Sequence, residues 1–170
     1  MRFRQPLIAG AALVLGLLGG TASTASAEPE EAGPSCGLVD QMRAALRDEV
    51  GPGVGGVRSV LRQPYWLFEV QQNDVKAKLD ILEGGADHLR DLDDGEPVPG
   101  LAPLLGQFEA AVAEARKETE DIFYFRVLNV YTQTPVLSRH PIRPSYWEKL
   151  DRVDDLSDQI DDFLDNVACD

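Results

Sequence analysis

Apolar residues recur at every third or fourth position along most of the chain, a spacing that is typical of amphipathic helices. A first helix is expected in residues 37–50, GLVDQMRAALRDEV, and the glycine-rich stretch GPGVGG at 51–56 predicts its end. A second helical segment is expected from about Val57 to Leu92. Pro64 should either kink this segment or occupy the first turn of a new helix. The pair Gly84-Gly85 weakens the segment, so its stability has to come from packing.

Two further helices are expected in the second half of the chain. The linker DDGEPVPG precedes a third helix, which is expected from about Leu101 to Tyr131. The next stretch, TQTPVLSRHPIRP, is rich in proline and has no helical period. A fourth helix follows, and Ser145 and Glu148 form an S-x-x-E capping box at its start.

The second and third helices carry apolar spacings that mirror each other. The second repeats Val75, Leu79, Leu82, Ala86 and Leu89, and the third repeats Leu105, Phe108, Val112, Ala115 and Thr119. In an antiparallel pair Val75 would meet Thr119 and Leu89 would meet Leu105, with the turn at 93–100 where this pairing requires it. We therefore expect an antiparallel helical hairpin with knobs-into-holes packing.

These elements together predict an all-α fold, an up-down antiparallel bundle of about four helices. The first helix of such a bundle starts at the end where the fourth helix finishes. The two cysteines of the chain, Cys36 and Cys169, lie at these positions. Two cysteines at the same end of a bundle can form a disulfide, so we expect one terminal bridge that closes the bundle if the protein is exported, as the N-terminal pattern described next indicates.

The N-terminus has the pattern of a secretory signal peptide. Arg2 and Arg4 precede an apolar run, and the small residues Ala25-Ser26-Ala27 form a cleavage site. We expect cleavage after Ala27, a disordered leader at 28–35 and a single bundle domain at 36–170. Later apolar runs fall short of the roughly 20 residues that a membrane span needs, so a secreted, extracellular protein without membrane insertion is expected.

The charge of the chain narrows the choice of partners. The formal net charge is −13, and loss of Arg2 and Arg4 with the signal peptide leaves 14 basic against 29 acidic side chains. Such a protein is repelled by the phosphates of nucleic acids, so no nucleic-acid partner is expected.

The fourth helix carries an acidic face on the side away from its apolar seam. Seven aspartates lie on it: Asp151, Asp154, Asp155, Asp158, Asp161, Asp162 and Asp165. Such a one-sided charge run is typical of a solvated helix face. The repulsion between the aspartates should be offset, either by arginines of a neighbouring helix such as Arg43 and Arg47 or by loosely held calcium.

The sequence contains no motif of a known catalytic, metal or cofactor site. HExxH, CxxC, G-x-S-x-G, P-loop and dinucleotide fingerprints do not occur. Gly85 and Leu137 precede His88 and His140 by three residues, which excludes the E-x-x-H motif of di-iron bundles. We therefore assign no catalytic residue, no metal ligand and no cofactor.

Aromatic residues gather at the end of the predicted bundle that is opposite the disulfide. QPYWLFE and RPSYWEK both begin helices at this end, where the third helix also finishes. The candidate ligand-binding residues are Tyr65, Trp66, Arg126, Tyr131, His140, Tyr146 and Trp147. Amphipathic aromatics at a loop-rich end suit a binding surface for a small ligand, a glycan or a protein. The alternative is an aromatic plug that closes the core.

Two single charges stand in apolar runs near this end, Glu69 in YWLFEV and Arg126 in IFYFRVL. The helical register places them side by side, so we expect a buried ion pair. The pair would fix the register, or Arg126 would be partly free to hold an anionic ligand.

The sequence thus predicts an exported, soluble protein that binds an extracellular ligand or partner protein through its aromatic end, without catalysis. One alternative is a secreted helical enzyme that uses scattered arginine and carboxylate side chains. Another is an acidic protein that binds cationic partners or loosely held divalent cations.

Overall fold

The computed structural model describes residues 33–170, except for 65, 66, 128–130 and 132. The predicted signal peptide and the leader up to residue 32 therefore lie outside the described residues. So do two of the candidate site residues, Tyr65 and Trp66.

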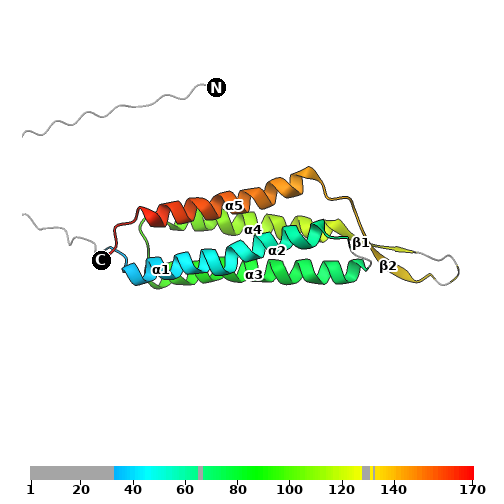
Figure 1. Cartoon of the computed structure of the whole chain (residues 1–170), viewed down its shortest axis with the longest axis horizontal. Coiled ribbons are helices and arrows are strands. Elements are labelled where there is room, and N and C mark those ends of the chain that lie inside the picture. Colours follow the sequence, from blue (N-terminus) through cyan, green and yellow to red (C-terminus); the bar gives the residue numbers. More distant parts are fainter. Residues whose placement is uncertain (1–32, 65–66, 128–130, 132) are drawn as a thin grey trace, which may run out of the picture. The chain divides into compact units, whose positions relative to one another are not determined.

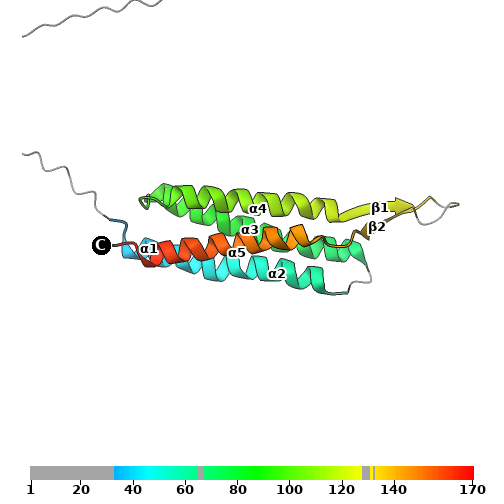
Figure 2. The ribbon, with the colours of Figure 1, turned by 90° about the horizontal axis from the view of Figure 1, so that it is seen from above.

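The predicted antiparallel bundle is confirmed, and a small β-hairpin is added to it (Figure 1). Helix α1 (Cys36–Ala45), the π-helical turn η1 (Leu46–Val50) and α2 (Gly51–Arg62) follow one another as one long rod. The other helices are α3 (Phe68–Gly95), α4 (Ala102–Ile122) and α5 (Pro144–Asp165). The strands β1 (Phe123–Val127) and β2 (Pro135–Arg139) pair antiparallel between α4 and α5. Figures 1 and 2 both show this hairpin projecting beyond the helices, at the end opposite the C-terminus.

The core follows the predicted apolar stripes. All ten residues of the mirrored spacings in α3 and α4 are buried, from Val75 to Leu89 and from Leu105 to Thr119. Helix α5 buries Tyr146, Leu150, Val153, Leu156, Ile160 and Leu164. Ion pairs on the flank of the α3–α4 pair link Arg116 to Asp80, 2.9 Å apart, and Arg90 to Glu109, 2.7 Å apart. These contacts join residues close to the expected register.

The expectation that GPGVGG ends the first helix is wrong, because the helix continues through it as α2. The glycines serve close packing between α2 and α3. A β-carbon on Gly53 would lie 2.9 Å from Leu82 Cβ, and one on Gly85 would lie 3.1 Å from atoms of Glu49 and Val50. Helix α3 therefore approaches α2 closely at Gly53 and η1 closely at Gly85, and it continues through Gly84-Gly85.

Pro64 neither kinks a helix nor begins one. It lies in the connection between α2, which ends at Arg62, and α3, which starts at Phe68.

The predicted capping box at the start of the last helix is also wrong. Helix α5 begins at Pro144, with Arg143 at the N-cap position. Proline has its φ preset for a first helical residue, which places Ser145 inside the helix. The Ser145 hydroxyl instead lies 3.3 Å from Glu118 Oε1 on α4.

The chain ends meet as predicted, because Cys36 and Cys169 form a disulfide with their Cα atoms 5.0 Å apart. Backbone hydrogen bonds reinforce this contact. The Cys36 N–H donates to the Asp170 carbonyl, and the Asp170 N–H donates to the Pro34 carbonyl. Residues 33–35, expected at the end of the leader, thus pack against the C-terminus, and Ser35 caps α1.

Among the described residues, the structure contains no helix that is long and apolar enough to cross a membrane.

Candidate functional site at the hairpin end

The β-hairpin replaces the last part of the predicted third helix. Helix α4 ends at Ile122 rather than near Tyr131. The Ile122 carbonyl accepts a hydrogen bond from the His140 N–H at 2.8 Å. The ladder continues with Phe123 opposite Arg139 and Phe125 opposite Leu137. Aromatic and β-branched residues suit a strand at least as well as a helix, and pairing with β2 decides between the two.

A buried polar contact anchors the hairpin to the helices. Gln71 is fully buried, and its Nε2 donates to the Val60 carbonyl at 2.9 Å. Arg139 donates to Gln71 Oε1 at 2.9 Å and to the Leu61 carbonyl at 3.1 Å. Its guanidinium also lies over the Phe68 ring, 5.7 Å from the centroid. Arg139 thus satisfies the C-terminus of α2 with a positive charge, which the helix dipole favours.

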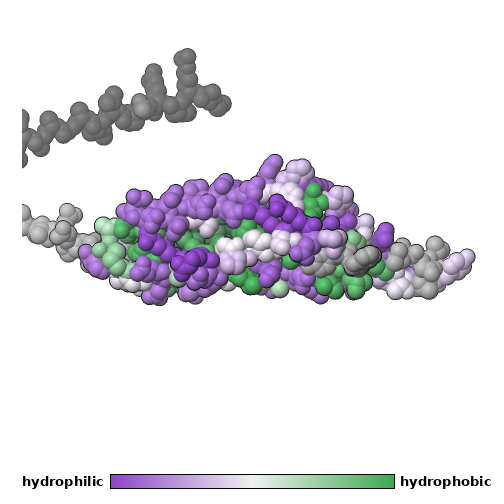
Figure 3. All heavy atoms as spheres, viewed as in Figure 1, coloured by the Kyte–Doolittle hydropathy of each residue, from purple (hydrophilic) through white to green (hydrophobic). Residues whose placement is uncertain are grey.

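Large apolar side chains are exposed around the hairpin. On β1, Phe125 is 68% exposed and Tyr124 37%, and Tyr131 in the connection to β2 is 98% exposed. Leu67 and Val70 at the start of α3 are 64% and 46% exposed. Figure 3 shows a patch of apolar atoms near the base of the hairpin, and other apolar patches over the bundle. We call these five residues together with Arg126 the hairpin surface.

The charge of this region differs from that of the rest of the protein. No aspartate or glutamate occurs from Ile122 to Trp147, although the chain contains 29 acidic residues. The same segment contains three arginines, Arg126, Arg139 and Arg143, and Arg126 is exposed on β1. This acid-free segment was not among the sequence predictions, although it is the signal in the sequence that indicates a surface distinct from the acidic bundle.

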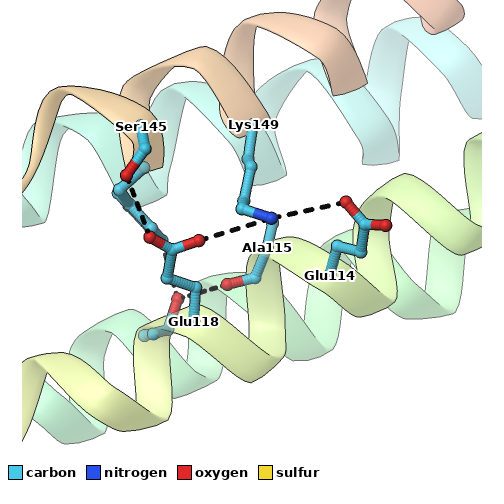
Figure 4. Close-up of polar contacts among 7 residues, drawn as sticks. Glu114, Ala115, Glu118, Ser145 and Lys149 are labelled. Atoms are coloured by element: carbon cyan, nitrogen blue, oxygen red, sulfur yellow. Dashed lines mark hydrogen bonds and ion pairs between the residues drawn. The ribbon is translucent and has the colours of Figure 1, made fainter.

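A polar groove of about 640 Å³ lies beside the hairpin, between α4 and the start of α5. Three carboxylates of α4 line it, together with basic side chains: Glu114, Glu118, Asp121, Lys117, His140, Arg143 and Lys149. In Figure 4 the Lys149 ammonium lies between Glu114 and Glu118, 3.4 Å from an oxygen of each. Burial acts to lower the pKa of Lys149, but the bonds to Glu118 and Glu114 raise it above its ordinary value. The groove is thus partly neutralised by its own side chains.

At the inner wall of the groove lies Tyr146, which is 1% exposed. Its hydroxyl is 2.7 Å from Thr119 Oγ1, and Thr119 donates to the Ala115 carbonyl at 2.8 Å. Burial raises the pKa of Tyr146 to about 12, although the bond to Thr119 acts in the opposite direction. For Tyr146 this environment fits the aromatic plug.

The other predicted site residues divide between the hairpin and the bundle. His140 stacks on Tyr124, with ring centroids 4.2 Å apart. Trp147 is half-buried, packs edge-on against Tyr146 at 5.8 Å, and has the Arg62 guanidinium 5.4 Å from its ring centroid. Tyr131 and Arg126 lie on the hairpin, so the structure does not gather all the candidates in one pocket.

The predicted buried ion pair between Glu69 and Arg126 is wrong. Arg126 lies on β1 opposite Val136, and both charged side chains are exposed. The helical register that placed them together does not extend past Ile122. Arg139 is the cation that packs against Phe68 and Gln71 instead.

The acidic face of α5 fits the interpretation as a solvated helix face. Six of its aspartates are exposed, and Asp154 is half-buried. Arg58 of α2 pairs with Asp151 and Asp154. Burial raises the pKa of Asp154, while Arg58 acts to lower it.

One of the two arginines that were expected to offset the repulsion between these aspartates does so. Arg43 pairs with Asp165, whereas Arg47 pairs with its neighbour Asp48. Within the described part of the chain, no group of three or more His, Cys, Asp or Glu side chains is arranged to hold a metal ion.

Comparison of the chain with protein-family models, with curated proteins and with solved structures gives no match.

Proposed function

We propose that this protein is an exported, non-catalytic interaction protein that binds an extracellular partner protein through the hairpin surface. The observation that carries the proposal is the clustering of exposed apolar side chains. Leu67, Val70, Tyr124, Phe125 and Tyr131 belong to this surface, and among the described residues Ile81 is the other large hydrophobic side chain that is exposed. Large apolar side chains that are exposed at one end of a protein are typical of a site of interaction.

The position of these side chains supports recognition of another macromolecule. The hairpin projects beyond the helices (Figures 1 and 2), so its side chains can contact a flat or concave partner without interference from the bundle. The anchor formed by Arg139 and Gln71 fixes the base of the hairpin before binding. A preorganised surface loses less conformational entropy on association.

The disulfide supports export. A disulfide that joins Cys36 and Cys169 forms and persists in oxidising compartments, in agreement with the signal-peptide pattern at the N-terminus.

A comparative capture experiment tests the proposal. The secreted protein would be cross-linked in the medium of the cells that produce it, and the captured proteins identified by mass spectrometry. Fully burying a phenylalanine contributes about 1.5–3 kcal/mol, so Phe125→Ser should weaken capture of a genuine partner about tenfold or more. Ile81→Ser removes a similarly exposed apolar side chain from the middle of α3 and should leave capture unchanged. Equal capture by both variants would contradict the proposal.

A second candidate is binding of a cationic partner along α5. Asp155, Asp158, Asp161 and Asp162 are exposed, and none of the ion pairs found among the described residues includes them. Binding through these aspartates should weaken steeply with added salt, whereas binding through apolar side chains should not. Capture at high salt therefore separates the two candidates.

A further inference from the structure

Strand β1 has an outer edge that is free to pair. In an antiparallel ladder, hydrogen-bonded and non-hydrogen-bonded residue pairs alternate. The bond from the His140 N–H to the Ile122 carbonyl sets this alternation, so Tyr124 and Arg126 bond to β2 while the N–H and C=O of Phe125 point away from it. Among the residues that the structure describes, no hydrogen bond reaches these two groups of Phe125.

The position of Pro135 supports this assignment of hydrogen-bonded and non-hydrogen-bonded pairs. It stands opposite Val127, which the alternation makes a non-hydrogen-bonded pair. Proline has no N–H to donate to a ladder, so a sheet accepts it where that position faces outward.

The outer edge of β2 is closed, in contrast to that of β1. Pro135 at its start lacks a donor, and Leu137 is buried. The Arg139 side chain ties the end of β2 to the helices through Leu61 and Gln71. An added strand therefore has one edge to use, that of β1.

The two faces of β1 would select different side chains in an added strand. Tyr124 and Arg126 share one face with Ser138 and Val136, while Phe125 lies on the other face with Leu137. Cross-strand neighbours on the same face contact each other directly. A matching strand would thus place an acidic residue beside Arg126 and an apolar residue beside Phe125, in alternation.

Charge favours a different protein over a second copy of this chain as the occupant. Pairing two β1 edges would bring together two hairpins that each carry arginines and no acidic residue between Ile122 and Trp147. Like charges on residues directly opposite each other in neighbouring strands are destabilising. An acidic strand from another protein would meet complementary charge.

We propose that the β1 edge accepts an extended segment of the partner, in which acidic and apolar residues alternate, as a third strand of the sheet. This inference rests on the proposed function, because it names the partner of the same hairpin surface. Main-chain hydrogen bonds to Phe125 supply affinity, and the exposed Arg126 and Phe125 side chains supply selectivity, as in other cases of β-strand addition.

The test uses the full secreted protein with its disulfide intact and two fluorescent probe peptides of about seven residues, the length of an ordinary strand. One peptide alternates Glu and Val, and the other alternates Lys and Val. The Glu-Val peptide should bind and should slow amide hydrogen exchange at Phe125, and the Lys-Val peptide should bind at least about tenfold more weakly.

Three variants locate the binding. Phe125→Pro removes the outward N–H and leaves the bonds of Tyr124 and Arg126 in the ladder, so it should weaken binding of the Glu-Val peptide about tenfold or more. Arg126→Glu should reverse the preference between the peptides. Lys117→Glu makes the same charge change at an exposed position in the groove and should have little effect. As a control, amide hydrogen exchange of the Phe125→Pro variant without peptide shows whether β1 and β2 remain paired.

Each remaining outcome is decisive. Failure of the Glu-Val peptide to bind, or equal binding of both peptides, overturns the inference. A concentration-dependent dimer in light scattering that Phe125→Pro abolishes also overturns it, because a second copy then occupies the edge. If the peptides fail while partner capture still depends on Phe125, the proposed function stands and the strand-addition inference falls.

Discussion

Two alanine substitutions on α2 should change stability in opposite directions, although they add the same methyl group two residues apart. Gly55 is exposed, and a β-carbon placed there meets no atom within 4 Å. Gly53 is buried, and a β-carbon there would lie 2.9, 3.1 and 3.2 Å from Leu82 Cβ, Cα and N. We expect Gly55→Ala to stabilise the protein and Gly53→Ala to destabilise it.

The magnitudes follow from two opposing contributions. Replacing glycine by alanine inside a helix gains about 0.8–1 kcal/mol, and this gain applies to both positions. Carbon atoms pack best at about 3.5–4.0 Å, so the Gly53→Ala methyl overlaps α3 by more than half an ångström. Two of the crowded Leu82 atoms are backbone, which cannot rotate away. Overpacking of this kind costs about 1–3 kcal/mol and outweighs the gain, so Gly53→Ala should lower the free energy of unfolding by up to about 2 kcal/mol.

The assay is urea unfolding followed by circular dichroism, with the disulfide intact in all proteins. The informative quantity is the difference between the two variants, about 1–3 kcal/mol, because the helix-propensity gain cancels in it. Gly84→Ala and Gly85→Ala form a second matched pair on α3. Gly84 meets no atom within 4 Å, and Gly85 meets Glu49 and Val50 at 3.1 Å. Equal stabilisation by Gly53→Ala and Gly55→Ala would refute the close approach of α2 and α3.

Three further predictions concern the disulfide, the buried tyrosine and the acidic face. Replacing both Cys36 and Cys169 by serine should lower the free energy of unfolding by up to about 5 kcal/mol, because the bridge spans 133 residues; an unchanged urea midpoint would contradict this. The pKa of Tyr146, raised by burial to about 12, lies above that of the unfolded chain, so its contribution to stability is complete below about pH 10 and is lost as the pH rises from about 10 to 12. This loss, up to roughly 2–3 kcal/mol, should be absent in Tyr146→Phe when both proteins are unfolded in urea across that pH range. Calcium should raise the Tm gradually and no more than magnesium does, because it screens the exposed aspartates of α5; a saturable, calcium-selective rise would indicate a dedicated site instead.

Several features of the fold followed from local sequence. The apolar stripes of α3, α4 and α5 specified where these helices lie and which side of each is buried, because an amphipathic helix can bury its stripe only against another element. The cysteine positions and the order of four antiparallel helices predicted the disulfide. The sequence also indicated which end of the bundle gathers aromatic residues.

The glycines of α2 could not be interpreted from local sequence. The stretch GPGVGG has a low helix propensity, which predicted that the first helix ends there. The helix continues because Gly53 lets α3 pack closely against α2 and Gly85 lets it pack closely against η1, which stabilises all three. That gain exists only when the second helix is present, so it cannot be read from the α2 sequence.

The hairpin also depended on tertiary contacts. The segment FYFRV continues an apolar run from α4, and its aromatic and β-branched residues fit a helix or a strand. Pairing with β2 and the bonds from Arg139 to Leu61 and Gln71 select the strand, and both join residues that are distant in sequence. The sequence by itself indicated that Arg126 would lie near the aromatic end. Only the tertiary structure decided that Arg126 and its neighbour Phe125 face solvent beside an open strand edge, because that depends on which residues of β1 form hydrogen-bonded pairs with β2.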